Sequence, residues 1–555
     1  MRRFVLHGPI GVVAALIFAG SFVLLVAGMS HEISVYDEAL ILVGATRVAD
    51  GAVLHRDFYA NYGPAQFYLL AGLFKVFGSS VLVERVWDTV VRAMIVTVAF
   101  LIVRRAVSRF EGLVAAGLVL IWVCVFGTYS FPVFPSVLFA LFGALCLLPI
   151  FEGQRSLPLL FGSGVCVGIT VLFRYDVGFY TFIALTMVTS VYQLSRPIPL
   201  NARISDLLWA LLPCWLGVAT ICAPVVAAYA AGGVIQDFLF DILYYPAHFY
   251  RRMRALPFPG LRTMLGAPTQ IGIYLPVIIW VTALCAAALG RRSASLTGMS
   301  AARPWIMLLL GTLSALFYLK GLVRVSLIHM ALSIVPALIL SAMLLPYVRR
   351  DASHRIARPA MVAALVGLIV VALPTLVATA NDGRAALHNA IWAVRMSPWT
   401  AAAEDKPTGI ASCRPSSGLE RIACFEIDQT RADAIRYVES HSRPNDFIFV
   451  GLRHHDRIFV NDILFYFVAA QRPATKWYHF DPGLQTSKEI QIAMIGELQT
   501  TKPHYVVLEA EWDDYAEPNE SAVSSGVMLL DDFVRANYQP VQAFGKITVL
   551  QAKES

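Results

Sequence analysis

Acidic side chains gather between His31 and Glu84, directly after the first apolar segment of the chain. Asp37 and Glu38 are adjacent near the start of this stretch, and Asp57 follows. A carboxylate within hydrogen-bond reach of a hydroxyl can take its proton as the hydroxyl attacks, and carboxylates also hold divalent cations at phosphate sites. The stretch therefore predicts acid–base chemistry at the surface of a membrane.

A second charged stretch lies between residues 236 and 268, where arginines alternate with aromatic residues. Guanidinium groups bind phosphate bidentately, and aromatic rings favour the depth of lipid headgroups. The pattern predicts binding of a lipid-linked phosphate, and pairing with anionic lipid headgroups is the alternative. The residues are Arg251, Arg252, Arg254, Arg262, Tyr244, Tyr245, Phe249 and Tyr250.

Two further boundary segments carry charge. Lys320 and Arg324 lie in a short turn, with His329 one helical turn into the following apolar run. Arg174 and Asp176 stand between two apolar runs. Boundary cations also snorkel to the membrane surface, and a structural Arg174–Asp176 pair is equally compatible with the pattern, so both interpretations stay open.

Composition decides which elements must position these groups. The chain has 555 residues, of which 57% are hydrophobic and 15% charged, and its mean hydropathy is +0.65. Apolar runs long enough to cross roughly 30 Å of hydrocarbon recur up to about residue 380. The sequence predicts a polytopic α-helical membrane protein with about eleven transmembrane helices, at residues 9–29, 85–103, 111–128, 132–151, 158–173, 177–194, 207–230, 270–289, 304–320, 325–347 and 359–379.

The distribution of arginine predicts the orientation. If the N-terminus lies inside, every inner segment carries arginine, as the positive-inside rule requires. The formal net charge of +7 is explained in this way, without a nucleic-acid partner. We therefore predict a bacterial inner-membrane protein with a cytoplasmic N-terminus, a membrane module over 1–380 and a periplasmic domain over 381–555.

Two outer loops are expected, over 30–84 and 232–268. In the first, the stretches 38–50 and 64–77 are amphipathic and each is followed by glycine, which predicts two short helices. The second stretch is too short to span a bilayer, so we expect it to lie in the interface plane.

Two cysteines, Cys413 and Cys424, lie in the soluble part of the chain. They flank a loop-like segment and would form a disulfide in an oxidising compartment. Two free thiols are the alternative. The other six cysteines lie in apolar runs, where a thiol behaves as a small hydrophobe.

From about residue 430 the pattern alternates between strand and helix, which predicts a small α/β domain. It contains no glycine-rich phosphate loop or metalloprotease motif. His454, His455 and Asp456 are a weak metal-binding pattern, and a solvated loop explains them more simply. The expected strands are 446–450, 476–480, 504–510 and 546–552, and the expected helices are 430–440, 461–470, 486–500 and 524–536.

Several short patterns together resemble the bacterial GT-C glycosyltransferases. These are polytopic enzymes related to protein O-mannosyltransferases and aminoarabinose lipid A transferases, similar to glycosyltransferase family 39. Ser326 stands where the resemblance leads us to expect Asp. The patterns are Tyr36-Asp37-Glu38, the segment Gly51 to Phe58, Tyr62-Gly63-Pro64, Phe77-Gly78, Arg174-Tyr175-Asp176-x-Gly178 and Arg324 with His329.

The resemblance implies inverting transfer of a sugar from a polyprenyl-phosphate-linked donor to a hydroxyl of a lipid, polysaccharide or protein, at the outer membrane face. It implies that Asp37 is the general base. Glu38, Asp57 and Asp176 are further catalytic candidates, and Mg²⁺ or Mn²⁺ at Asp37 and Asp57 is a candidate cofactor. A helix N-cap is the alternative role for Asp37.

The leaving phosphate gains negative charge and therefore needs preorganised cations. The candidates are Lys75, Arg174, Arg251, Arg252, Arg254, Lys320, Arg324 and His329. The candidates for contacting the sugar or the lipid are Tyr59, Tyr62, Phe67, Tyr244 and Tyr245, although interface anchoring explains these rings equally well.

A transporter or flippase of lipid-linked sugars is the main alternative. Such proteins bury charge at the middle of their spans and often consist of two related halves. This sequence places its unusual charges on one outer face and shows no repeated halves, so an enzyme is favoured.

Overall fold

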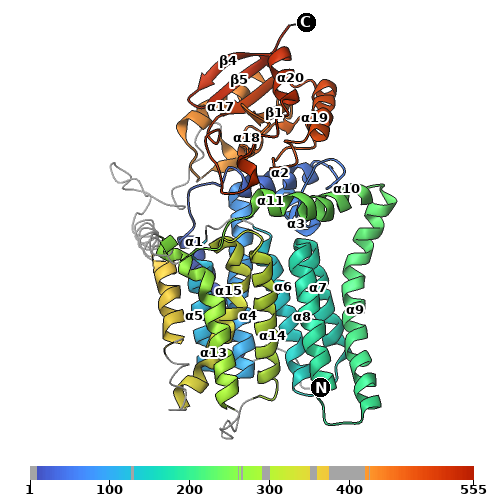
Figure 1. The fold of residues 1–555 in the computed structure, drawn as a ribbon, viewed down its shortest axis with the longest axis vertical. Helices are drawn as coiled ribbons and strands as arrows, with labels where there is room; N and C mark the ends of the chain where they lie inside the picture. The colour runs from blue at the N-terminus through green and yellow to red at the C-terminus, as the bar shows by residue number, and fades with distance from the viewer. Residues whose placement is uncertain are drawn as a thin grey trace, which may run out of the picture.

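The computed structural model describes residues 9–126, 131–260, 262–263, 267–290, 300–350, 359, 361–373, 419–423 and 425–554. A bundle of apolar helices forms one end of the molecule and a small sheet domain forms the other (Figure 1). Short helices from two loops lie between them. The cysteines Cys413 and Cys424 and the predicted boundary at residue 380 lie outside the described residues.

The bundle consists of apolar helices, as the apolar runs predict. Seven described helices are long and apolar enough to cross a membrane, so the chain is a multi-pass membrane protein; the number eleven stays a prediction. The seven are α1 (Pro9–Ala27), α4 (Val81–Ala106), α6 (Val133–Phe151), α8 (Tyr175–Leu194), α9 (Leu200–Ala231), α14 (Arg303–Gly321) and α15 (Leu327–Arg350). The bundle also contains the shorter helices α5 (Arg109–Val123), α7 (Leu157–Phe173), α13 (Leu275–Gly290) and a helix over 361–373.

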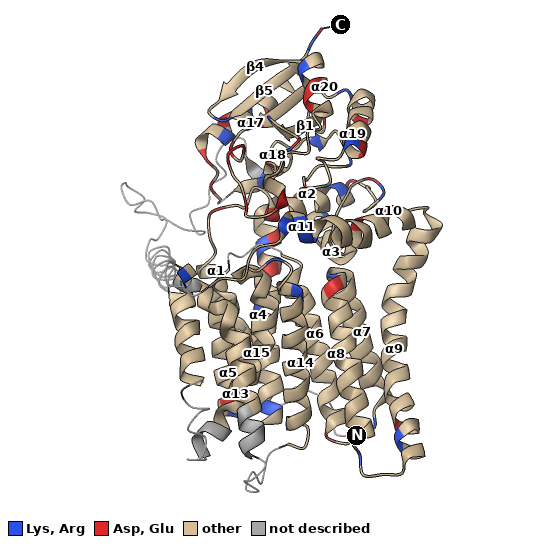
Figure 2. Ribbon diagram, in the orientation of Figure 1, with Lys and Arg blue, Asp and Glu red and all other residues tan. Residues whose placement is uncertain are grey.

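Charge is scarce along the bundle and concentrated at its ends. Figure 2 shows mostly uncharged ribbon through the helices and groups of charged residues where the bundle meets the sheet domain. Glycines allow close helix packing within it: a Cβ on Gly164 of α7 would lie 1.8 Å from the backbone oxygen of Cys214 on α9. Small residues commonly bring membrane helices together in this way.

The first outer loop contains the two helices expected from its amphipathic stretches. They are α2 (Asp37–Ala49) and α3 (Pro64–Phe77). Gly51 and Gly78 follow them with φ of 97° and 87°, values that glycine adopts without strain. The placement of these helices in the interface plane stays a prediction.

The second outer loop is helical but irregular. It contains α10 (Ile235–Leu239), two π-helical turns, η1 (Phe240–Tyr244) and η2 (Pro246–Tyr250), and α11 (Arg251–Arg254). A 3₁₀ turn, η3 (Pro268–Tyr274), then leads into α13. In Figure 1, α11 lies beside α2 between the bundle and the sheet domain.

The sheet domain is α/β, as predicted. Its sheet has the order β2-β1-β3-β5-β4, in which β1 is parallel to β2 and β3, and β5 is antiparallel to β3 and β4. The elements are β1 (Phe447–Leu452), β2 (Arg472–Pro473), β3 (Tyr505–Glu509), β4 (Tyr538–Phe544), β5 (Ile547–Ala552), α17 (Gln429–His441), α18 (Leu464–Val468), α19 (Lys488–Thr501), α20 (Leu529–Asn537), η5 (Glu420–Ile422) and η6 (Glu520–Ala522).

One strand prediction in this domain was wrong, and two strands were missed. The segment 476–480 is not a strand, and β2 and β4 were not predicted. The aromatic residues of 476–480 pack against the first loop, where the Tyr478 hydroxyl donates to the Leu40 backbone oxygen at 2.9 Å. The aromatic residues of this segment are therefore explained by contact with the first loop, and not by the alternation of a β-strand.

The sheet domain and the first loop share one hydrophobic core. Buried residues of α2 and α3, such as Leu40 and Phe67, pack in the same cluster as Ile463 and Phe465 of the sheet domain. Backbone hydrogen bonds join the same parts: the Tyr59 amide donates to the Lys476 oxygen at 3.1 Å. The first loop is therefore held from the side opposite the bundle.

Candidate active site

A cavity of about 260 Å³ lies at the end of the bundle that faces the sheet domain. Its walls come from the first loop, from α8, from the second loop and from the α14–α15 turn. The lining residues are Asn61, Tyr62, Phe131, Arg174, Tyr175, Asp176, Tyr180, Ile242, Pro246, Tyr250, Lys320, Val323, Arg324 and His329. The cavity thus brings together Tyr62, Arg174, Asp176, Lys320, Arg324 and His329 from the predicted site.

Arg174 and Lys320 meet at Asp176. Arg174 Nε and Nη2 donate to the two oxygens of Asp176 at 3.0 and 3.1 Å, and Lys320 Nζ lies 3.9 Å from Asp176 Oδ2. The guanidinium lies 5.2 Å from the centre of the Tyr62 ring. The structural pair expected for Arg174 and Asp176 is therefore present, and it lies in the cavity wall with a second cation beside it.

The α14–α15 turn supplies the third cation. Arg324 binds Glu517 of the sheet domain through two N–H groups at 2.6 and 2.8 Å, and it donates to the Arg254 backbone oxygen at 2.9 Å. His329 Nδ1 lies 2.7 Å from the Ser326 hydroxyl, so Ser326 has a polar contact at the position where an Asp was expected.

Asp37 is the first residue of α2, and it is accessible to solvent although protein atoms surround it on most sides. The N-cap position belongs to Tyr36, and the Ser34 hydroxyl oxygen accepts the Asp37 backbone N–H at 3.1 Å, so Asp37 does not serve as the cap. Among the described residues no hydrogen bond or ion pair engages the Asp37 carboxylate. The surrounding protein raises the pKa of Asp37 by desolvation, Arg254 and Arg324 oppose this rise, and Asp481 adds to it.

Asp37 is electrically coupled to the cavity. Its charge acts on Tyr62, a lining residue, and on the neighbouring Tyr36. Asp37 is therefore close enough to Arg324 in the cavity wall for their charges to interact. A carboxylate without a partner and with a raised pKa is suited to accept a proton.

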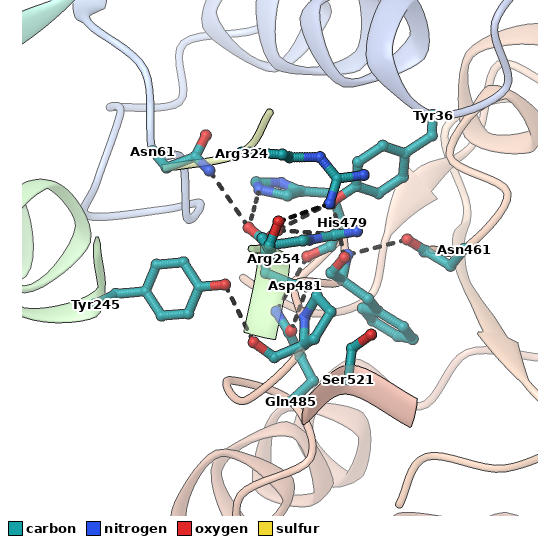
Figure 3. A network of polar contacts seen from close by, with 12 residues as sticks. Tyr36, Asn61, Tyr245, Arg254, Arg324, Asn461, His479, Asp481, Gln485 and Ser521 are labelled. Atoms are coloured by element: carbon teal, nitrogen blue, oxygen red, sulfur yellow. Dashed lines mark hydrogen bonds and ion pairs between the residues drawn. The ribbon is translucent and has the colours of Figure 1, made fainter. Parts of the chain in front are cut away.

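Asp481 of the sheet domain is the centre of a polar network (Figure 3), and its charge acts on Asp37. Its carboxylate lies 3.2 Å from Arg254 Nη2 and accepts the Tyr59 hydroxyl at 3.0 Å. Tyr36 and Asn61 donate to it at 3.4 and 3.5 Å. Sequence reasoning missed Asp481 and Glu517 because both lie far along the chain in a domain without a recognisable motif.

Other predicted acids lie elsewhere. Glu38 is fully buried, and Arg85 of α4 binds both of its oxygens at 2.7 and 2.9 Å, so Glu38 is not part of the proposed catalytic set. Asp57 pairs with Arg56 at 2.8 Å, which lowers its pKa, and lines a different pocket. These ion pairs remove both carboxylates from the cavity.

The remaining predicted cationic and aromatic residues differ in how far they are buried. Lys75, Arg251 and Arg252 are exposed, whereas Arg254 is buried in the Asp481 network. Phe67 is in the core shared with the sheet domain, against Phe58. Tyr59 and Tyr245 are buried beside Asp481 and Pro482, and Tyr244 is 48% exposed.

A divalent cation is not built into this arrangement. Within the part of the chain that the structure describes, no three His, Cys, Asp or Glu side chains are grouped to hold a metal ion. Asp37 and Asp57, the predicted ligands, are not brought together, because Asp57 is held by Arg56 in the other pocket. The pair does not fit a shared ion, so no step of the chemistry below passes through a metal.

No family model matches the chain, and no curated protein matches it. Two solved structures of GT-C glycosyltransferases are similar to it. ArnT from Cupriavidus metallidurans in the apo state shares 12% identity at a TM-score of 0.56, over 99% of this chain and 100% of that chain. This chain has the GT-C fold.

A second GT-C structure agrees. AglB, the archaeal oligosaccharyltransferase from Archaeoglobus fulgidus, was solved in complex with an inhibitory peptide and a dolichol-phosphate. It shares 11% identity at a TM-score of 0.50, over 98% of this chain and 74% of that chain. At such identities the likeness carries the GT-C fold, and the chemistry has to be argued from the side chains of this chain.

Proposed function

We propose that this chain is a glycosyltransferase that moves a sugar from a polyprenyl-phosphate-linked donor to an acceptor hydroxyl on the outer face of the membrane, with inversion at the anomeric carbon. One observation carries the proposal. Asp37, whose carboxylate no described residue engages by a hydrogen bond or ion pair, interacts electrostatically with Arg324 in the wall of a cavity, within a GT-C fold. The same cavity wall holds Arg174 and Lys320. Base and cations are the two groups that such a transfer needs.

Asp37 and three cations of the cavity wall have separate roles in the reaction. Asp37 takes the proton of the acceptor hydroxyl, whose oxygen forms a bond to the anomeric carbon. The bond from that carbon to the phosphate oxygen breaks, and the electron pair stays on the phosphate. Arg174, Lys320 and Arg324 stabilise the added negative charge. Attack from the face opposite the leaving phosphate inverts the anomeric centre.

Asp176 has a different role from Asp37 in this proposal. Both of its oxygens face cations, Arg174 at 3.0 and 3.1 Å and Lys320 at 3.9 Å. These ion pairs engage both oxygens of Asp176, so it is not the base in this proposal. Asp176 therefore orients the two cations toward the cavity.

The donor assignment rests on the position of the cavity. It lies where apolar helices end and charged loops begin, which suits a ligand with a lipid tail and a phosphate. The similar AglB structure holds a dolichol-phosphate and a peptide. By analogy we infer a lipid phosphate and an acceptor that is a lipid, a glycan or a protein.

We further propose that the N-terminus is cytoplasmic and that the sheet domain lies in the periplasm, on the inner membrane of a bacterium. Arginines support this orientation. Arg104 and Arg105 end α4 at the bundle end away from the cavity, in agreement with the positive-inside rule.

The decisive experiment compares envelope glycans and glycolipids by mass spectrometry in cells that lack the gene. Cells are complemented with wild type, Asp37→Asn or Asp50→Asn at matched membrane levels. Asp50 follows α2 at its other end and serves as the control. We expect wild type and Asp50→Asn to restore a missing sugar, and Asp37→Asn to lower its rate of transfer by about 10²–10⁴.

Two results would contradict the proposal. Full restoration by Asp37→Asn would remove Asp37 from the chemistry. Unchanged glycans together with a lipid-linked sugar retained on the inner leaflet would indicate a transporter or flippase.

A further inference from the structure

Two segments of the sheet domain enter the candidate site. One contains His479 and Asp481, and the other contains Glu517 and Asn519. Each segment holds a loop arginine through a carboxylate, Asp481 with Arg254 at 3.2 Å and Glu517 with Arg324 at 2.6 Å. Asn519 also donates to the Ala255 backbone oxygen at 3.1 Å, so the end of α11 is fixed from two sides.

Asp481 joins the loop residues that flank the base and the cavity. Tyr36, which donates to it, directly precedes Asp37, and Asn61, which also donates to it, directly precedes Tyr62. The Tyr36 hydroxyl makes a second bond, to the Phe480 backbone oxygen at 2.7 Å. The same sheet-domain segment thus holds both ends of the site, as Figure 3 shows for its labelled residues.

The chemistry of Asp481 differs from that of a base. Its side chain is 5% exposed, and four donors from the two outer loops engage its oxygens, so it is not placed to take a proton from a substrate. His479 lies 3.7 Å away and adds no charge near neutral pH, because burial lowers its pKa to about 4. Arg254 is therefore the main charge partner of Asp481. Loss of this carboxylate would leave the Arg254 charge buried without its partner, which strongly destabilises a protein.

We propose that Asp481 is a positioning residue of the active site: it holds Arg254, Tyr36 and Asn61 in place around Asp37 and the cavity, so that the sheet domain is a working part of the catalytic unit. The proposal rests on the proposed glycosyltransferase function. Misplacement of a reacting group by about 1 Å can cost 10²-fold in rate, so loss of the contacts that Asp481 makes is expected to slow the chemical step.

Charge adds a measurable signature. The groups that face Asp37 are Arg254 of the second loop, Arg324 of the α14–α15 turn, Asp481 of the sheet domain, and Tyr36 and Tyr62 of the first loop. Asp481 raises the pKa of Asp37, and the two arginines lower it. Replacement of Asp481 by Asn removes the raising charge, so the pKa of Asp37 falls. The acid limb of the pH–rate profile then moves to lower pH, because Asp37 stays ionised at lower pH than in the wild type.

The test uses inner-membrane vesicles from complemented cells, whose endogenous lipid-linked donor supplies the sugar. The variants are Asp481→Asn, Asp481→Glu, Tyr59→Phe and Asp513→Asn. Asp513 pairs with the exposed Arg453 in the same domain at 3.0 Å and serves as the matched control. Product formation is followed from pH 5 to 9, and binding of added undecaprenyl phosphate is measured on purified full-length protein.

We expect Asp481→Asn to lower kcat by about 10²-fold, to move the acid limb to lower pH and to leave undecaprenyl phosphate binding within about threefold of wild type. Asp481→Glu keeps the charge and restores part of the rate. Tyr59→Phe removes one hydrogen bond and gives a smaller loss in the same direction. If Asp481→Asn is not recovered as folded protein by gel filtration, the rates and pH profiles of Asp481→Glu and Tyr59→Phe decide.

Three outcomes separate the hypotheses. A rate and pH profile for Asp481→Asn equal to those of Asp513→Asn would overturn the positioning role. Tighter lipid binding with faster turnover would also overturn it, because Asp481 would then be a competing anion on Arg254. An absence of transfer by wild type would reject the proposed function itself.

Discussion

At the scale of single residues, the contact between Arg174 and the Tyr62 ring is a feature that one substitution can isolate. The guanidinium lies over the ring at 5.2 Å while its N–H groups bind Asp176. The ring, rather than the hydroxyl, makes this contact. A cation–π contact of this kind contributes about 2 kcal/mol where water is excluded.

Tyr62→Leu is therefore expected to raise the donor KM by up to roughly 30-fold, since every 1.4 kcal/mol corresponds to a factor of ten. Tyr62→Phe keeps the ring and is expected to behave as wild type. Initial rates in membrane vesicles at varied donor concentration measure both. Equal KM values for the two variants would show that the ring does not support Arg174.

Single residues also show what sequence could and could not locate. Asp37, Arg174, Lys320 and Arg324 were predicted because each is an unusual charge at a membrane boundary. Asp481 and Glu517 lie in a soluble domain, where an acidic residue is ordinary, and only the three-dimensional contacts with Arg254 and Arg324 single them out.

At the scale of elements, α3 is fixed to the end of α7 by Gly63. The Gly63 amide donates to the Phe173 backbone oxygen at 3.3 Å, and a Cβ at Gly63 would lie 2.0 Å from the Leu172 backbone oxygen. Tyr62 precedes this contact, and Arg174 follows α7. The close approach therefore sets the distance between the two sides of the cavity wall.

Gly63→Ala is expected to push α3 away from α7 and to reduce transfer activity, with a lower melting temperature of the purified protein. Backbone atoms cannot yield as a flexible side chain can. Gly72→Ala on α3 has open space around its Cβ and is the control, expected to retain activity and stability. Thermal unfolding and vesicle assays of both variants test this, and equal behaviour would contradict the account.

Elements differ in how far sequence can predict them. Long apolar runs and helices closed by glycine were predictable, because period and capping are local properties. The edge strand β4 was not, since Pro540 and glutamines interrupt its pattern. Proline is tolerated there because β4 lies at the edge of the sheet and its pairing with β5 is irregular at Pro540.

At the scale of the whole molecule, the core shared by the first loop and the sheet domain joins two distant parts of the chain. Leu40 and Phe67 pack in one buried cluster with Ile463 and Phe465. Removal of the sheet domain would leave this apolar surface in water, which is unfavourable in proportion to its area.

A chain that ends at residue 400 is therefore expected to lose transfer activity and to become sensitive to protease within residues 31–84. A chain that ends after Lys553 keeps the sheet and is the control. Limited proteolysis of vesicles with the outer face exposed, followed by mass spectrometry, gives the cut sites. A truncated protein that is fully active and resistant would show that the shared core is dispensable.

The shared core also fixes an order of events during synthesis. Roughly 340 residues separate the first loop from Leu419, where the described part of the sheet domain begins. At 5–20 residues per second the ribosome needs on the order of 20–70 s to make them. For that time the apolar residues of α2 and α3 lack their partners from the sheet domain, so newly made protein is at its most vulnerable to aggregation and degradation outside the membrane before its last domain is complete.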